Sequence, residues 1–121
     1  MKKEFKVISQ IINDNKKVLD VGCGDGTLMQ YLKFNQKNDV RGLEPNKKLV
    51  QECIAKGLSV IQGDAEKELF QFPDKSFDYV VLSQTLQAFL SPENVLKELL
   101  RIGKNTIVSI PNFGYWKVRL H

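Results

Sequence analysis

The sequence predicts an α/β fold in which one parallel β-sheet carries helices on both faces, with residues 1–121 forming a single domain. Three observations indicate this fold. Short apolar runs typical of buried strands alternate with segments whose apolar residues recur every three or four positions. The first apolar run leads through three closely spaced glycines into a helical pattern. Acidic residues stand at the ends of the first three strands, and parallel sheets bind ligands at that edge.

The predicted elements follow one another along the chain with short connections. Helical periodicity covers residues 4–14, 28–32, 46–56 and 92–103, and strand-like runs cover 18–21, 40–44, 59–62, 77–82 and 106–110. Strands that alternate with helices imply right-handed connections and a parallel sheet, in which five strands would take the order 3-2-1-4-5. The order reverses between strands one and four, where we expect a ligand to bind.

Four element boundaries have their own local signals. Pro45 cannot extend a strand ladder and suits the first turn of the helix that follows. Gly57 fits the position just after a helix. Ser91 is a candidate N-cap with Pro92 at the first helical position, and Pro111 ends the fifth strand.

Composition limits the classes of function. No apolar run approaches the ~20 residues that span a bilayer, and the start lacks the apolar core of a signal peptide, so we expect a cytoplasmic protein without membrane contact. Two cysteines, Cys23 and Cys53, provide neither a disulfide framework nor metal-ligand spacing. Because His121 is the only histidine, Cys23 is better explained as a small residue in a tight loop than as a nucleophile.

Positive charge gathers at the end of the chain. The residues after Glu98 include four basic and no acidic side chains, and three aromatic residues are interleaved with them. This combination can stack on nucleic acid. We favour the alternative, in which the aromatic side chains pack against a part of the protein that this sequence does not contain. The residues concerned are Arg101, Lys104, Lys117, Arg119, Phe113, Tyr115 and Trp116.

The spacing of the glycines in the turn discriminates between two kinds of ligand. A dinucleotide fingerprint, G-x-G-x-x-G, needs its third glycine at position 27, which is Thr27. The third glycine instead comes one residue earlier, as Gly26, and Asp20 stands two residues before Gly22. This spacing argues against a nicotinamide dinucleotide. Glycines at alternate positions permit positive φ angles and let a ligand approach the backbone.

The pattern D-x-G-x-G-x-G resembles motif I of class I S-adenosylmethionine (SAM) methyltransferases, a Rossmann-like fold. That resemblance implies that the loop holds the methionine end of SAM. Glu44 ends the second strand, where an acid can accept hydrogen bonds from both ribose hydroxyls; the alternative is a solvated acid at a strand end. The resemblance implies that Asp64 accepts a hydrogen bond from the adenine amino group. It also implies that the backbone N–H of Ala65 donates to a nitrogen of the adenine ring. A turn-forming Asp64 is the alternative.

Other polar residues near the strand ends have expected roles. We expect Asp20 to orient the loop or contact the ligand's amino group, directly or through water. Asp78 is interpreted as structural, and Gln84 as a candidate substrate contact. No catalytic residue and no metal site is predicted. The predicted SAM-binding residues are Asp20, Gly22, Cys23, Gly24, Gly26, Glu44, Pro45, Asp64, Ala65 and Ser83.

Longer segments resemble the MetW-type proteins of bacterial methionine biosynthesis. They are VLDVGCGDGTL, CIAKGLSVIQGD, FPDKSFDYVVLSQTLQ and IVSIPNFGYWKVRL, which together cover most of positions 17–120. The resemblance implies a SAM-methyltransferase fold linked to methionine synthesis, with homoserine O-acetyltransferase as a functional partner. Members of that family are longer, so we expect this chain to be partial and to lack the sixth and seventh strands of the full sheet.

Two functions fit these features. The first is a SAM-dependent methyltransferase, because methyl transfer needs alignment and a dry site more than a nucleophile from the protein. The second is a SAM-sensing regulatory subunit of homoserine O-acetyltransferase. Both use Asp20, Gly22, Gly24, Glu44 and Asp64 in the same way, so these residues do not separate them. A dinucleotide-binding enzyme and a nucleic-acid-binding protein are disfavoured.

Overall fold

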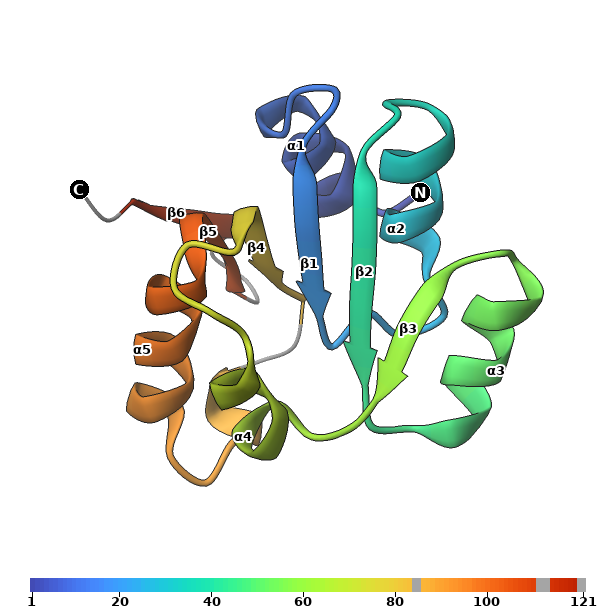
Figure 1. Cartoon of the computed structure of the whole chain (residues 1–121). Coiled ribbons are helices and arrows are strands. Elements are labelled where there is room, and N and C mark those ends of the chain that lie inside the picture. Colours follow the sequence, from blue (N-terminus) through green and yellow to red (C-terminus); the bar gives the residue numbers. More distant parts are fainter. Residues whose placement is uncertain (84–85, 111–113, 120–121) are drawn as a thin grey trace.

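The computed structural model describes residues 1–83, 86–110 and 114–119 (Figure 1). The expected substrate contact Gln84, the predicted strand end Pro111 and the aromatic residue Phe113 lie outside these residues. The remaining chain forms one sheet with helices on both faces, so the predicted fold class is confirmed.

Six strands form the sheet in the order β3-β2-β1-β4-β5-β6, and the first five of these run parallel. The predicted order 3-2-1-4-5 is therefore confirmed, and it reverses between β1 and β4 as expected. In Figure 1 the sheet can be followed from β3 on one side to β5 and β6 on the other. The strands are β1 (Lys17–Val21), β2 (Asp39–Glu44), β3 (Ser59–Gln62), β4 (Phe77–Leu82), β5 (Gly103–Ile110) and β6 (Gly114–Arg119).

The sixth strand corrects the expectation that the chain ends before any further strand. β6 pairs antiparallel with β5, from Asn105 opposite Arg119 to Ile110 opposite Gly114. Three residues separate the two strands. So short a connection permits antiparallel pairing alone, because a parallel neighbour needs a crossover of about a dozen residues. The edge of β5 is thus paired, and Tyr115 and Trp116 belong to a strand.

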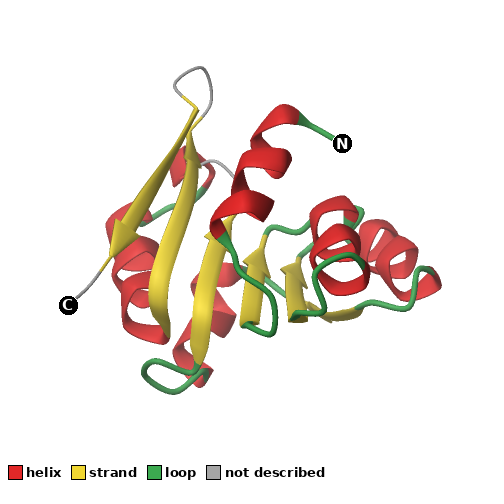
Figure 2. Cartoon of the chain, turned by 90° about the horizontal axis from the view of Figure 1, so that it is seen from above, coloured by secondary structure: helices red, strands yellow, loops and turns green. Residues whose placement is uncertain are grey.

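Helices α1, α2 and α3 cover one face of the sheet, and α4, η1 and α5 cover the other (Figure 2). Successive strand residues enter opposite layers: Val18 packs with the first layer and Leu19 with the second, and neither is exposed. The helical elements are α1 (Lys3–Ile11), α2 (Thr27–Phe34), α3 (Lys47–Ala55), α4 (Ala65–Glu68), η1 (Leu69–Gln71), η2 (Leu86–Ala88) and α5 (Pro92–Ile102).

Some helix boundaries differ from the expected ones. α1 ends three residues before position 14, and Asn15 then adopts a positive φ of 61° on the way into β1. The short elements α4, η1 and η2 carry too few apolar residues for a periodic signal, so the sequence did not predict them. Ser91 precedes α5, but its side chain makes no capping hydrogen bond.

Candidate functional site

The glycine-rich loop leaves the carboxyl end of β1, next to the point where the strand order reverses. Its first two residues, Gly22 and Cys23, donate backbone hydrogen bonds to the Leu43 carbonyl of β2, at 2.8 and 3.3 Å. On the other side, the Ser83 N–H at the end of β4 donates to the Val21 carbonyl at 3.0 Å. The sheet therefore brings the ends of β1, β2 and β4 together around this loop.

All three glycines of the loop have positive φ angles, at 74°, 60° and 85° for Gly22, Gly24 and Gly26. A side chain at Gly24 would meet no atom within 4 Å, so the space beside it is open. At Gly26 an added Cβ would lie 2.5 Å from Leu58 Cδ1 and 3.0 Å from Cys53 Sγ. Gly24 thus leaves room for a ligand, whereas Gly26 is required by the packing of the protein itself.

Glu44 joins the loop to the end of β2. Only 6% of Glu44 is exposed, and its Oε1 accepts the Gly24 N–H at 2.9 Å. Its Oε2 accepts the Asn46 N–H, also at 2.9 Å. The predicted ribose acid is therefore a buried carboxylate tied to the loop backbone, rather than a solvated acid at a strand end. Each oxygen keeps lone pairs that can accept a further hydrogen bond.

Asp20 lies behind the loop and is 1% exposed. Its Oδ1 accepts a hydrogen bond of 2.8 Å from the Ser83 hydroxyl, while its buried Oδ2 has no partner among the residues that the structure describes. Burial raises the pKa of Asp20 from 3.8 to about 7, the Ser83 hydrogen bond opposes this rise, and nearby Glu44 adds to it. The pairing of Asp20 with Ser83 across two strands is a contact that sequence spacing did not reveal.

The two cysteines are buried beside the same loop. Cys53 Sγ lies 3.2 Å from the Gly24 carbonyl oxygen, and Cys23 Sγ lies 3.9 Å from it. Burial raises the pKa of both thiols, and for Cys23 the charge of Asp20 adds to the rise. A thiol with a raised pKa forms little thiolate and is a poor nucleophile. The structure therefore supports the interpretation of Cys23 as a small residue that fills a tight loop.

Asp64 and Ala65 stand at the start of α4, after the end of β3. Asp64 Oδ1 accepts the Glu66 N–H at 3.0 Å, so this exposed acid caps the helix. Ala65 is buried, and Pro45 is an exposed residue between β2 and α3. Asp78 is paired as its structural interpretation requires, because its Oδ2 accepts the Lys17 N–H at 2.8 Å.

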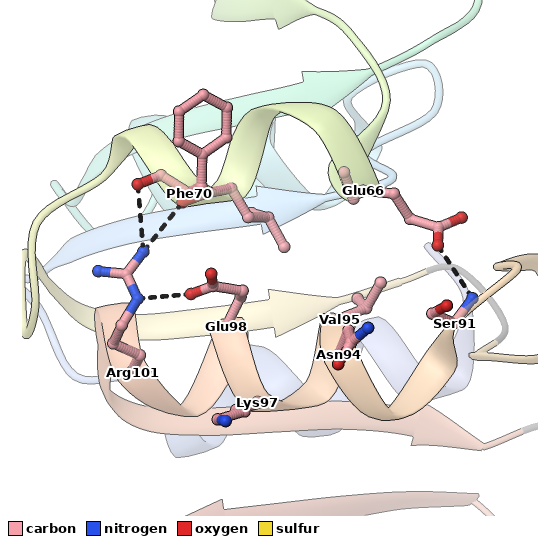
Figure 3. Close-up of a pocket in the computed structure, with 10 residues that line it drawn as sticks. Glu66, Phe70, Ser91, Asn94, Val95, Lys97, Glu98 and Arg101 are labelled. Atoms are coloured by element: carbon pink, nitrogen blue, oxygen red, sulfur yellow. Dashed lines mark hydrogen bonds and ion pairs between the residues drawn. The ribbon is translucent and has the colours of Figure 1, made fainter.

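A separate pocket of about 570 Å³ lies between α4, η1 and α5 (Figure 3). Ala65 is the one residue that it shares with the predicted SAM-binding set. Glu66 of α4 accepts the N–H groups of Leu90 and Ser91, both at 2.9 Å, and so joins α4 to the residues just before α5. The pocket is lined by Ala65, Glu66, Leu69, Phe70, Ser91, Asn94, Val95, Lys97, Glu98 and Arg101.

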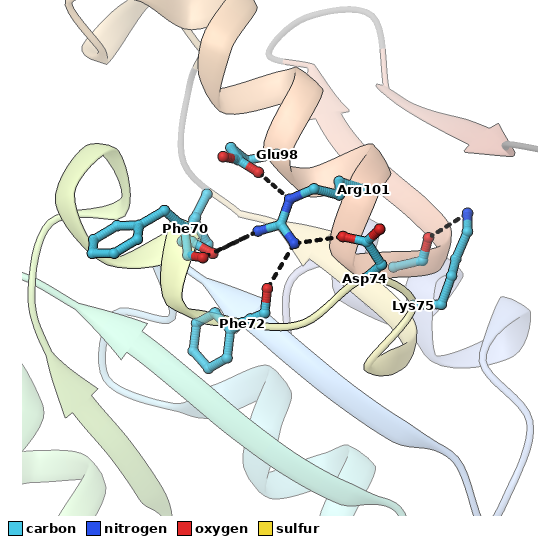
Figure 4. A network of polar contacts seen from close by, with 8 residues as sticks. Phe70, Phe72, Asp74, Lys75, Glu98 and Arg101 are labelled. Carbon is cyan, nitrogen blue, oxygen red and sulfur yellow. Dashed lines mark hydrogen bonds and ion pairs between the residues drawn. The ribbon is translucent and has the colours of Figure 1, made fainter.

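Arg101 lies at one end of this pocket (Figure 3), and Figure 4 shows its polar contacts. Its guanidinium donates to the Phe72 carbonyl at 2.7 Å and to the Leu69 carbonyl at 3.2 Å. It also forms ion pairs with Asp74 and Glu98. Because these partners occupy the guanidinium donors, Arg101 joins α5 to the segment between η1 and β4. The sequence offered no signal for this role.

Two features are absent from the part of the chain that the structure describes: a membrane-spanning helix and a metal-binding group of side chains. None of its helices has the length and apolar character needed to cross a membrane. Within the same residues, no group of three or more His, Cys, Asp or Glu side chains is arranged to hold a metal ion.

Comparison with known proteins places the chain among methyltransferase-like proteins. The bifunctional methionine biosynthesis protein MetXA/MetW of Rhodopirellula baltica is 34% identical over 122 residues, which cover 94% of this chain and 20% of that protein. The sterol 24-C-methyltransferase of Aspergillus fumigatus is 34% identical over 102 residues, which cover 77% of this chain and 26% of that enzyme. The chain thus spans about a fifth to a quarter of the length of these two relatives.

Solved structures agree with this placement. A SAM-dependent methyltransferase of Thermotoga maritima, described as a possible histamine N-methyltransferase, superposes with a TM-score of 0.71 at 27% identity, over 88% of this chain and 49% of the other. A TehB-like SAM-dependent methyltransferase of Corynebacterium glutamicum has the same fold, with a TM-score of 0.72 at 23% identity over 93% of this chain and 64% of the other. Residues 2–121 match the family described as methionine biosynthesis protein MetW. The chain belongs to the MetW family, and its fold is that of the class I SAM-dependent methyltransferases.

Proposed function

We propose that this chain is the SAM-binding part of a methyltransferase-like protein of methionine biosynthesis. The observation that carries the proposal is the position of Glu44, a buried carboxylate at the end of β2, the strand next to β1, whose Oε1 accepts the N–H of Gly24. A carboxylate fixed in this way can accept hydrogen bonds from two adjacent ribose hydroxyls. The open space beside Gly24 leaves room for the part of the ligand that follows the ribose.

The residues around the loop fit the chemistry of SAM. Asp20 and Glu44 supply negative charge where a ligand with a sulfonium and an ammonium group would bind. The unpartnered Oδ2 of Asp20 marks hydrogen-bonding capacity that the described protein leaves unused. Asp64 Oδ1 caps α4, and its second oxygen can accept from the adenine amino group. Cys23, Pro45 and Ala65 complete the surroundings of the ligand.

Methyl transfer from SAM does not require a covalent bond between the ligand and this chain. When bound, SAM supplies an activated methyl group on its sulfonium sulfur. The residues of the chain bind and orient the donor, and they exclude water from it on the side of the sheet. No general base is needed for an acceptor that is already deprotonated, such as a carboxylate or a thiolate.

Titration calorimetry with S-adenosylhomocysteine tests the proposal. Glu44→Ala removes hydrogen bonds to a charged group worth about 1.5–3 kcal/mol, so affinity is expected to fall roughly tenfold or more. Glu44→Gln keeps one acceptor for the Gly24 N–H and separates ligand binding from loop support. Asp39→Ala, an exposed acid at the opposite end of β2, is the matched control. Undiminished binding in both Glu44 variants, or low-micromolar binding of NAD to the parent, contradicts the proposal.

A second candidate function is regulation of homoserine O-acetyltransferase in response to SAM. The fused MetXA/MetW relative favours it, because one polypeptide there carries a segment similar to this chain together with a further, longer part. Fusion keeps two partners at high effective concentration. Capture of the acetyltransferase by the tagged protein, with and without SAM, tests this function. SAM-dependent capture supports regulation, and methylation of a small molecule without any such capture contradicts it.

A further inference from the structure

The end of α3 contacts the second half of the glycine loop, residues 24–26. The Cys53 thiol, on the last full turn of α3, donates a hydrogen bond to the Gly24 carbonyl at 3.2 Å. The Lys56 ammonium group, at the helix end, donates to the Asp25 carbonyl at 2.8 Å. Two successive carbonyl groups of the loop are therefore held by side chains of one helix.

Gly26 extends this contact to a third loop residue. An added Cβ at Gly26 would lie within 3.0 Å of both Cys53 and Leu58, so the loop backbone rests directly on these two side chains. Three consecutive loop residues thus contact the end of α3 and the turn that follows it. The side chains that make these contacts, Cys53, Lys56 and Leu58, are called the α3 clamp.

The two halves of the loop are held in different ways. The first half continues the sheet, because the N–H groups of Gly22 and Cys23 both donate to a carbonyl of β2. The second half contains Gly24 and Gly26, at φ angles of 60° and 85°. Glycine loses more conformational freedom than any other residue when it is ordered. Contacts that order this half before a ligand arrives remove that cost from binding.

We propose that the α3 clamp pre-orders residues 24–26 for ligand binding. Lys56 and Cys53 are positioning residues, which act through the Gly24 and Asp25 carbonyls and do not touch the ligand. This inference rests on the proposed SAM site and adds the element that shapes its loop. Without the clamp, the peptide groups between the glycines can rotate, and each binding event has to fix them again.

Lys33 offers a matched control for Lys56. Lys33 on α2 donates to the Gly57 carbonyl at 2.8 Å, just beyond the end of α3. Both lysines are half-buried, and each donates to a backbone carbonyl at the same distance. Lys33→Met and Lys56→Met therefore remove the same charge and a comparable hydrogen bond. They differ in the carbonyl that is released, which belongs to the loop in the case of Lys56 alone.

Hydrogen exchange of the ligand-free protein tests whether the clamp orders the loop. The N–H groups of Gly24 and Gly26 are both hydrogen-bonded, so their exchange reports on loop opening. In Lys56→Met, we expect both amides to exchange roughly three to ten times faster than in the parent. Lys33→Met should leave both rates within about twofold of the parent.

Titration calorimetry with S-adenosylhomocysteine tests whether loop order supports binding. Lys56→Met should weaken affinity roughly threefold to tenfold, whereas Lys33→Met should stay within about twofold of the parent. Lys56→Arg keeps a donor and should recover most of the loss. Cys53→Ala should also weaken binding, and Cys53→Ser, which keeps a donor, should bind more tightly than Cys53→Ala. Urea unfolding of each variant confirms that it is folded.

Four results would overturn the role of the clamp and leave the proposed SAM site standing. One is unchanged exchange at Gly24 and Gly26 in Lys56→Met. Another is faster exchange in that variant with unchanged affinity. The others are equal weakening of binding in Lys33→Met, and no recovery in either conservative variant. A parent protein that does not bind S-adenosylhomocysteine is a different result, because it removes the proposed SAM site itself.

Discussion

The edge of the sheet at the glycine loop, residues 22–26, is called the loop edge. It differs from the pocket between α4 and α5 in how its polar groups are paired. At the loop edge, Asp20 is buried, its Oδ2 has no partner among the residues that the structure describes, and the space beside Gly24 is open. In the pocket, Arg101 and Glu66 form hydrogen bonds with other groups of this chain, including backbone carbonyl and N–H groups. The pocket has a defined volume of about 570 Å³, yet its polar groups are paired within the fold, whereas the loop edge keeps hydrogen-bonding groups that the described residues leave unused.

This difference separates stability from binding. Buried charge and unsatisfied groups lower stability and are retained where a ligand uses them. Satisfied networks join elements and raise stability without leaving anything for a ligand. Substitutions at the loop edge should therefore change ligand affinity, whereas substitutions in the pocket should change stability. Gly26 is an exception that lies in the loop but serves packing.

The largest expected effect comes from Gly26. Gly26→Ala places a Cβ 2.5 Å from Leu58 Cδ1 at a φ of 85°, and we expect a stability loss of about 2–4 kcal/mol from overpacking and backbone strain. Gly24→Ala is the matched control, since its Cβ meets no atom within 4 Å, and about 1–2 kcal/mol of backbone strain remains. Urea unfolding measures both losses. Equal losses would show that packing does not distinguish the two glycines.

Asp20 should make stability depend on pH. Burial raises the pKa of Asp20 from its ordinary value of 3.8 to about 7, so the folded state binds the extra proton between these values. This contribution is present at low pH and is lost as pH rises towards 7. Asp20→Asn should therefore stabilise the protein by about 2–3 kcal/mol more at pH 8 than at pH 5. Chemical unfolding at both pH values, with Asp39→Asn as the control, measures this; a pH-independent difference would refute it.

The smallest effect concerns the pocket. Arg101→Ala removes hydrogen bonds to the Phe72 and Leu69 carbonyls, and we expect a stability loss of about 1–2 kcal/mol. Affinity for S-adenosylhomocysteine should stay within about twofold of the parent. Lys97→Ala, an exposed residue of the same pocket, should change neither quantity. A marked loss of affinity in Arg101→Ala would move the pocket into the ligand site.

Local patterns predicted most of the fold. The strand ending at Val21, the glycines after it and Glu44 at the next strand end follow from apolar runs and turn residues that are local in sequence. Lys47–Ala55 and Pro92–Ile102 also lie where periodicity indicated helices. The short helix after Asp64 was missed because four residues show no period. The antiparallel β6 was missed because the basic, aromatic end was interpreted without a partner strand.

The sequence by itself determined the alternation of strands and helices, the glycine loop and the acids at the strand ends, because each depends on residues close together in the chain. The tertiary structure alone decided which of these groups share contacts. It brought Ser83 to Asp20 across 63 positions and Gly24 to Glu44 across 20, and it placed Gly26 against Leu58. Such contacts depend on strand register and helix packing, which no local pattern encodes. They distinguish the glycine that packing needs from the one that leaves room for a ligand.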